Sequence, residues 1–182
     1  MHIKNIIFPL SLAATTTALP TAQPNTFTLV AVHPGSDVDG TSLSAAQRSI
    51  FAGLASQNAD CARAEKQVAT FYIKDEALYL YGKSESPQEL YVDRSGMGQG
   101  RLGYTTGAEA GSRNAEREGW AIEGGNLQFS GSDLIACPKS VDDSWSIWVS
   151  AGVSNPGGNS DCVGITARVQ EAPNPNACTY SS

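Results

Sequence analysis

The amino-acid sequence predicts an all-β protein, a compact single-domain β-sandwich or barrel of about ten short strands. The first observation is that glycine and proline, 18 and 9 in number, interrupt the chain at intervals of roughly eight to fifteen residues. The second is that the stretches between them are rich in Val, Ile, Thr and aromatic residues, which favour strands. The third is the length of the chain, because 182 residues suit one domain with a sizeable core.

Residues 1–22 have the order of a secretory signal peptide. The basic residue Lys4 is followed by the apolar stretch 6–14 and then by small residues ending at Ala18. This apolar stretch is too short to cross about 30 Å of hydrocarbon. We predict a signal peptide over 1–18, with cleavage as late as residue 22 as the alternative, and a single secreted β-rich domain over 23–182.

Side-chain alternation and turn residues locate the strands of the first half. Residues 27–33 alternate weakly and stop at a Pro-Gly pair. Residues 69–73 and 77–81 flank a short turn, which predicts a hairpin. In the second strand of this hairpin, Leu78 and Leu80 share one face and the tyrosines at 79 and 81 share the other, so one face should meet the core.

Glycine-rich turns predict two more hairpins in the second half. The polar segment between these hairpins is expected to be a surface loop. The hairpins pair 89–93 with 101–105 and 120–122 with 127–129, the loop covers 107–119, and the remaining strands are 133–136, 144–149 and 163–169.

The segment 43–54 is ambiguous. Leu43, Ala46, Ile50 and Leu54 recur at three to four residues, which is typical of a helix. Gly53 interrupts that pattern. A short helix and an irregular strand therefore both remain open here.

Four cysteines, Cys61, Cys137, Cys162 and Cys178, follow the signal peptide, and none has the close spacing of a metal or redox motif. In an exported chain this predicts two disulfides. Three pairings exist in principle. We favour Cys137 with Cys162, which end and begin strand-like runs on either side of one intervening strand, and therefore Cys61 with Cys178, which would tether the tail 170–182.

Charge excludes some classes of partner. The chain has 12 basic and 18 acidic residues, and the loss of Lys4 with the signal leaves a net charge of about −7. Nucleic-acid binding depends on clustered Lys and Arg, so it is disfavoured. No later apolar stretch reaches the length of a membrane span, and we expect a soluble monomer without a membrane partner or a cofactor.

Catalytic chemistry finds little support in the residues. His33 is the single histidine after the signal, and it ends a predicted strand next to a proline, where a structural role is the better reading. Asp142 and Asp143 are adjacent and are explained by a turn, while Glu89 and Glu123 have no evident partner. We expect no enzyme.

A metal site is equally unsupported. Asp37 and Asp39 precede Gly40 as in the middle of a calcium loop, but Gly35 and Ala46 occupy the first and twelfth ligand positions. We predict an Asp-rich turn and no metal site.

Aromatic residues offer a different chemistry, because exposed rings stack on the apolar faces of sugars. Trp145 and Trp148 are three residues apart and would face opposite sides of a strand, so they cannot form one platform. The predicted glycan-binding residues are the tyrosines on or near the hairpin, Tyr72, Tyr79, Tyr81 and Tyr91.

The order of several short segments resembles the fungal cell wall protein PhiA family over most of 27–169. Members are small secreted proteins of the wall or the culture fluid, some of them IgE-binding, and similar secreted proteins elicit plant defence. The family has further cysteines before the tyrosine strands, where this chain has Cys61 alone, so the resemblance extends to the Cys137–Cys162 pairing and leaves the other pairing open. The segments are FTLVAVHPGS at 27–36, QELYVD at 88–93, LGYT at 102–105, LIACP at 134–138 and DCVG at 161–164.

The resemblance implies a secreted, non-enzymatic protein of the fungal wall, which hosts recognise as an antigen or a defence elicitor. It carries over no catalytic residues. Its expected partners are wall polysaccharide or a host receptor or antibody. The alternatives are a hydrolase that cleaves wall polysaccharide with two carboxylates and a small-molecule binder with an apolar cavity.

Overall fold

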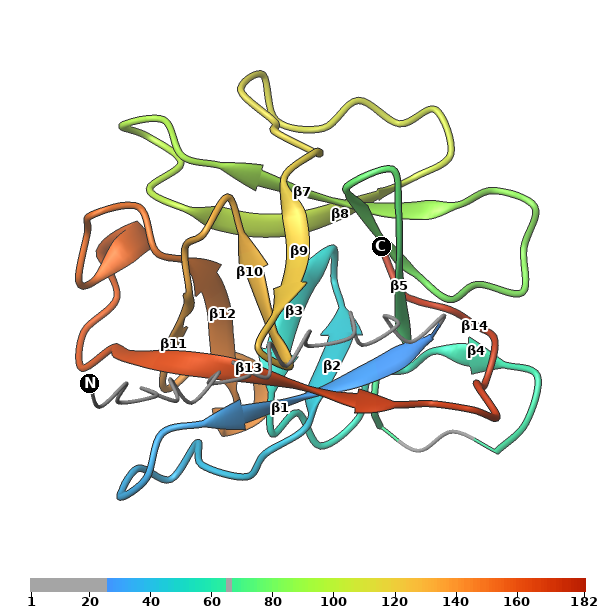
Figure 1. Ribbon diagram of the computed structural model, residues 1–182, viewed down its shortest axis with the longest axis horizontal. Coiled ribbons are helices and arrows are strands. Elements are labelled where there is room, and N and C mark those ends of the chain that lie inside the picture. The colour runs from blue at the N-terminus through green and yellow to red at the C-terminus, as the bar shows by residue number, and fades with distance from the viewer. Residues whose placement is uncertain (1–25, 65–66) are drawn as a thin grey trace, which may run out of the picture.

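The computed structural model describes residues 26–64 and 67–182, and the predicted signal peptide lies outside these residues. Twelve strands form one large antiparallel sheet, and two short strands, β4 and β14, form a second (Figure 1). Their bounds are β1 Phe27–Val32, β2 Leu43–Ala46, β3 Ser49–Ala52, β4 Asp60–Cys61, β5 Phe71–Lys74, β6 Ala77–Leu80, β7 Gln88–Asp93, β8 Arg101–Thr106, β9 Trp120–Glu123, β10 Asn126–Phe129, β11 Leu134–Cys137, β12 Trp145–Val149, β13 Val163–Glu171 and β14 Cys178–Thr179.

The large sheet closes on itself. Its strand order is β1-β5-β6-β7-β8-β3-β12-β11-β13-β10-β9, and an additional pairing joins β1 to β13. Six residue pairs connect these two strands, from Phe27↔Glu171 to Val32↔Thr166. The fold is therefore a barrel, and closure leaves fewer unpaired strand edges than an open sheet would.

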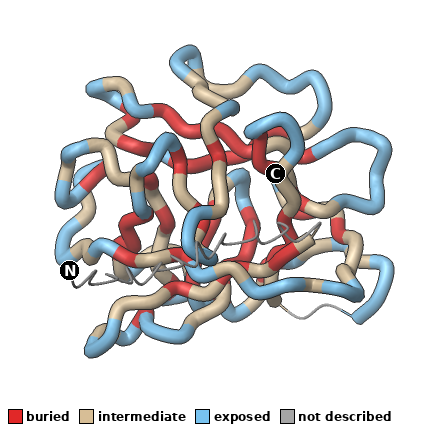
Figure 2. The backbone as a smooth tube through the Cα atoms, in the orientation of Figure 1, coloured by how far each residue is buried: buried red, intermediate tan, exposed pale blue. Residues whose placement is uncertain are grey.

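The core lies inside this closed sheet, where alternate side chains of each strand point inward. In β1 the residues Phe27, Leu29 and Ala31 are buried and their neighbours are half-buried. Figure 2 shows buried residues running along the strands and exposed residues concentrated in the loops. The largest fully buried side chains include Trp120, which meets Phe129 edge-on with ring centroids 4.9 Å apart.

The helix considered for 43–54 is absent, and the segment folds as the β2–β3 hairpin. Gln47 and Arg48 form its two-residue turn with φ of 49° and 58°, the left-handed pair that suits a tight hairpin. Both faces of the hairpin are covered: Ile50 joins the main core, whereas Phe51 packs in a smaller cluster with Leu54. Burial on both sides removes the alternation that marks a strand.

The other predicted hairpins form as expected, namely β5–β6, β7–β8 and β9–β10. The turn between β5 and β6 consists of Asp75 and Glu76, whose φ values are 50° and 60°. Leu78 and Leu80 are buried and Tyr79 is half-buried, as the alternation predicts.

Two disulfides cross-link the chain. Cys137 bonds to Cys162, and Cys61 bonds to Cys178, the two pairs favoured above. The second disulfide joins β4 to β14, so it holds the tail against the barrel. Within 26–64 and 67–182 there is no helix of the length and apolar character that a membrane span requires.

Candidate functional site

Two tyrosines stand side by side on the outer face of the β5–β6 hairpin. Tyr72 and Tyr79 are direct cross-strand partners, so their side chains leave the sheet on the same face. The rings stack with centroids 5.1 Å apart and planes inclined by 15°. Both residues remain half-buried, which leaves part of each ring open to solvent. The arrangement is a small, rigid aromatic surface.

Charged side chains adjoin this surface. Glu89 lies opposite Tyr79 on β7, and the Tyr79 hydroxyl donates to its Oε1 across 3.5 Å. The Arg117 guanidinium donates to Glu89 Oε2 across 3.0 Å and to the Thr105 hydroxyl across 3.0 Å. Burial, reinforced by the negative charge of Glu89, raises the pKa of both Tyr72 and Tyr79 above the ordinary value of 10.0. Both phenols therefore remain hydrogen-bond donors up to strongly alkaline pH.

An open pocket of about 420 Å³ continues from the outer side of Tyr72. Tyr81, Leu80 and Pro87 supply its apolar walls. Its polar groups come from Thr26, Ser84 and Glu85. Tyr72, Tyr79 and Tyr81, with this pocket, are called the tyrosine site below. Rings beside hydroxyl and carboxylate groups are suited to a ligand that has both apolar faces and hydroxyls.

Tyr91 does not belong to the tyrosine site. It lies on the same outward face of β7 as Glu89, but its side chain is 6% exposed. The loop between β8 and β9 covers it, and the Arg117 guanidinium lies 5.9 Å from the centre of its ring. Gly103 lies directly opposite on β8, where a Cβ would come within 2.9 Å of the Tyr91 hydroxyl. Tyr91 therefore packs against the loop between β8 and β9, and its ring is not available to a ligand.

Asp93 anchors the same loop at the end of β7. Its carboxylate accepts hydrogen bonds from the hydroxyls of Ser112 and Ser95 and from the Ser95 backbone N–H. These hydrogen bonds lower the pKa of Asp93 below the ordinary 3.8. The Ser112 bond has the largest effect, and the Ser95 hydroxyl bond has the next largest. Next to it, Arg94 pairs with Glu116 and lowers the pKa of that carboxyl as well.

Because the pKa of Asp93 is lower in the folded protein, ionised Asp93 stabilises the fold fully above the unfolded value near 3.8. That stabilisation disappears as the pH falls below this value and through the folded pKa. We expect Asp93→Asn to destabilise the protein at pH 7. As the pH falls from 5 to 2, the variant should lose less stability than the wild type. Urea denaturation across this pH range measures both effects, and parallel pH curves for the two proteins would contradict the assignment.

The residues weighed for catalysis or metal binding are scattered. The His33 ring Nδ1 donates a hydrogen bond to the Gly164 carbonyl across 2.6 Å. Asp39 accepts a hydrogen bond from the His33 backbone N–H, as expected of an Asp-rich turn. Asp142 and Asp143 belong to a short 3-10 turn before β12. Among the described residues no three His, Cys, Asp or Glu side chains gather as they would around a metal.

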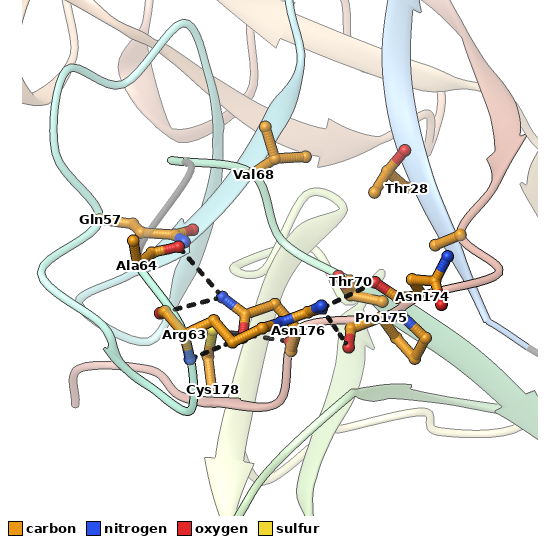
Figure 3. Close-up of a pocket in the computed structure, with 11 residues that line it drawn as sticks. Thr28, Gln57, Arg63, Ala64, Val68, Thr70, Asn174, Pro175, Asn176 and Cys178 are labelled. Atoms are coloured by element: carbon orange, nitrogen blue, oxygen red, sulfur yellow. Dashed lines mark hydrogen bonds between the residues drawn. The ribbon is translucent and has the colours of Figure 1, made fainter.

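A second pocket, of about 400 Å³, lies beside the Cys61–Cys178 disulfide (Figure 3). Arg63 crosses it and donates hydrogen bonds to the carbonyls of Asn174 and Pro175, each across 2.8 Å. The Asn176 side chain accepts from the Arg63 N–H and donates to the carbonyls of Arg63 and Ala64. Arg63 and Asn176, the main polar groups of this pocket, therefore hold the tail. Their role was not predicted from the sequence.

A closed antiparallel barrel with two disulfides and an aromatic surface patch is typical of small extracellular β proteins. The family model described as PhiA-like secreted protein matches residues 27–181. The chain belongs to this family. It is a secreted protein of the extracellular space or the cell wall.

Fungal relatives are similar along the whole chain. "Cell wall protein phiA" of Aspergillus fumigatus is 57% identical over 184 residues, covering 100% of both chains. The protein of the same name from Aspergillus niger is 54% identical over 183 residues, again with 100% coverage of both. That of Emericella nidulans is 61% identical over 174 residues, 94% of each chain. No solved structure matches the chain.

Proposed function

We propose that this protein is a non-catalytic component of the fungal wall that holds to neutral wall polysaccharide through the tyrosine site. The carrying observation is the stacked pair Tyr72–Tyr79 beside a pocket that combines rings with hydroxyl and carboxylate groups. The relatives are named as cell wall proteins, and polysaccharide is the abundant ligand in the wall.

The chemistry favours a neutral sugar polymer. A pyranose ring has an apolar face of C–H groups that packs on an aromatic ring, and hydroxyls at its edge that need hydrogen-bond partners. The tyrosine site offers rings from Tyr72 and Tyr81 and polar groups from Ser84 and Glu85. The net charge of the chain is −6, or about −7 without Lys4, which would repel acidic polymers.

Carboxylate electrostatics favour binding over hydrolysis. A glycosidase needs a carboxylic acid whose pKa is raised so that it can protonate the leaving group. Asp93 and Glu116 have pKa values that are lowered, by the Ser112 hydroxyl and by Arg94 respectively. Glu85 lines the pocket at the tyrosine site, and Glu89, beside Tyr79, is paired with Arg117. These features suit a surface that holds sugar without cleaving it.

Host recognition is the second part of the proposal. Residues 82–87 are six consecutive exposed residues at the rim of the tyrosine site, and the exposed segment 107–110 lies in the adjacent loop. A compact protein with two disulfides would present these loops in fixed conformations to antibodies or defence receptors. Antibody labelling of intact cells, before and after replacement of 82–87 by a Gly-Ser linker of equal length, tests this part.

The glycan proposal is tested by retention on insoluble β-1,3-glucan and chitin. We expect the mature wild-type protein to be retained and the double variant Tyr72→Ala/Tyr79→Ala to bind at least tenfold more weakly, because about 1.4 kcal/mol of ring contact corresponds to tenfold in affinity. Both rings are half-buried on the outer face, so the variant should keep its fold.

The matched control is Tyr72→Phe/Tyr79→Phe, which keeps both rings and removes only the hydroxyls. It should retain most of the binding, and thermal unfolding should show that all three proteins are folded. Equal retention of the wild type and the alanine variant, or no retention of the wild type on either polymer, would overturn the proposal.

A further inference from the structure

A groove with both apolar and polar side chains lies at the end of the β7–β8 ribbon opposite the tyrosine site. It has a volume of about 460 Å³ and is lined by β3, the β7–β8 turn, β8, β12 and the segments before and after β12. Met97 forms part of its rim and is 94% exposed. The groove's lining includes Met97, Arg101, Ser140, Ser146, Trp148 and Asn159.

Trp148 is the half-buried aromatic residue of this groove, and its ring is held in one position. Its indole N–H donates to the Ser146 hydroxyl across 3.0 Å. Its far edge lies against Gly157, where a Cβ would come within 2.4 Å of the ring. The Gly157 backbone N–H donates in turn to the Gln99 side chain across 2.8 Å, which links the loop to the β7–β8 turn. A fixed ring loses little conformational entropy when a ligand stacks on it.

Hydrogen-bond donors also line the groove. Arg101 is the direct cross-strand neighbour of Trp148, and its exposed guanidinium therefore lies on the same face of the sheet. Ser140 and Asn159 add a hydroxyl and an amide. The groove thus repeats the combination present at the tyrosine site, an aromatic surface bordered by groups that hydrogen-bond hydroxyls.

We propose that this groove is a second site for neutral wall polysaccharide, so that one protein molecule bridges two polysaccharide chains. This inference rests on the proposed function of the tyrosine site. Pro87, at the tyrosine site, directly precedes β7, and Met97 follows its end. Six strand residues at about 3.3 Å each separate the two sites by roughly 20 Å. Figure 1 shows the segment before β7 and the β7–β8 turn at opposite ends of the ribbon.

The separation decides what the two sites do. Two sites at opposite ends of one rigid ribbon bind two segments of polymer at once, which raises the affinity for a polymer by about 10²-fold or more over that for a short oligosaccharide. The same geometry joins separate chains into a network. The protein then acts as a non-covalent cross-link of the wall.

Titration of the isotopically labelled mature protein with laminarihexaose and chitohexaose, followed by NMR, tests each site in the unmodified molecule. We expect the indole N–H resonance of Trp148 and the amide of Gly157 to shift, together with the amides of residues 81–85. The indole N–H of Trp120 is an internal control, because that side chain is 2% exposed. Shifts at 81–85 without shifts at Trp148 would overturn the second site and leave the proposed function intact. Shifts at Trp148 alone would overturn the proposed function and bridging, and no shift at all would overturn both sites.

Light scattering of a soluble high-molecular-weight β-glucan tests bridging itself. Wild-type protein should raise the scattering, and excess protein should lower it again as every polymer site becomes occupied separately. Trp148→Ala and Tyr72→Ala/Tyr79→Ala should each abolish the rise while still binding the hexasaccharide at the remaining site. Met97→Ala, a change at an exposed position, should weaken the rise without affecting folding. A full rise with either of the alanine variants at Trp148 or the tyrosine pair would contradict bridging.

Discussion

Removal of the Cys61–Cys178 disulfide by a double substitution to alanine should lower the free energy of unfolding more than removal of Cys137–Cys162. The first disulfide closes a loop of 117 residues and the second a loop of 25. Loop-closure entropy in the unfolded chain then gives about 5 kcal/mol for the first and about 3.5 kcal/mol for the second. Guanidinium denaturation of the two double-alanine variants measures the difference.

Part of the stability lost with the Cys61–Cys178 disulfide should be lost from the tail alone, because the tail has contacts of its own with the barrel. Tyr180 is buried, and Gln88 bonds to it twice, donating to its carbonyl and accepting from its N–H, each across 2.9 Å. The Tyr180 hydroxyl accepts from the Thr70 N–H, and the Tyr104 hydroxyl donates to the Ser181 carbonyl. Without the disulfide, hydrogen bonds hold the tail, namely these and the ones that Arg63 makes with Asn174 and Pro175. The tail can then open before the barrel unfolds.

Hydrogen exchange distinguishes the two effects. In the variant without Cys61–Cys178, the amides of Cys178 and Tyr180 should exchange faster than those of β1 and β13, whereas in the variant without Cys137–Cys162 the tail should keep its protection. Equal denaturation midpoints for the two variants, with unchanged tail exchange, would show that the tail contacts suffice and that the long loop contributes nothing.

Local turn chemistry explains why much of the sheet is predictable from the sequence. The pairs Asp75-Glu76 and Gly124-Gly125 adopt positive φ between strands of clear alternation, so the hairpins on either side follow from neighbouring residues alone. The same reasoning fails for β2–β3, because side chains on both faces of that hairpin are buried and the alternation disappears.

Closure of the barrel depends on contacts between distant parts of the chain. The pairing of Phe27 with Glu171 joins residues 144 positions apart, and no local pattern sets its register. β4 and β14 have two residues each, and they pair at Cys61 and Cys178, the two residues that the disulfide joins. Long-range pairing therefore decides between the sandwich and the barrel, which the sequence leaves open.

The candidate site was predictable to the same degree. Alternation on β6 places Tyr79 outward, and the turn at Asp75-Glu76 brings Tyr72 beside it, so the stacked pair follows from the local sequence. Alternation also places Tyr91 outward, and it does lie on that face. Its burial depends on the path of the loop 107–119, which the sequence shows only as polar.

Gly100→Ala should strongly destabilise the β7–β8 turn. At φ of 94° its backbone is in a region that side chains rarely adopt, and a Cβ would lie 1.9 Å from the Val149 carbonyl oxygen. That contact is with backbone, so no side chain can rotate to relieve it. The Gly100 carbonyl also accepts from the Val149 N–H across 2.8 Å, which ties the turn to β12. We expect a loss of more than about 4 kcal/mol, or failure to fold.

Gly96→Ala is the matched control in the same turn, because Gly96 has no positive φ and no atom within 4 Å of an added Cβ. Its midpoint of thermal unfolding should stay close to that of the wild type, since exposed substitutions usually change stability by less than about 0.5 kcal/mol. If Gly100→Ala folds, displacement of the turn from β12 should also disturb the Gln99–Gly157 bond and the position of the Trp148 ring. The Trp148 indole resonance then reports this displacement. An unshifted resonance together with wild-type stability would contradict the prediction, because it would mean that the backbone at Val149 makes room for a methyl group without loss of stability.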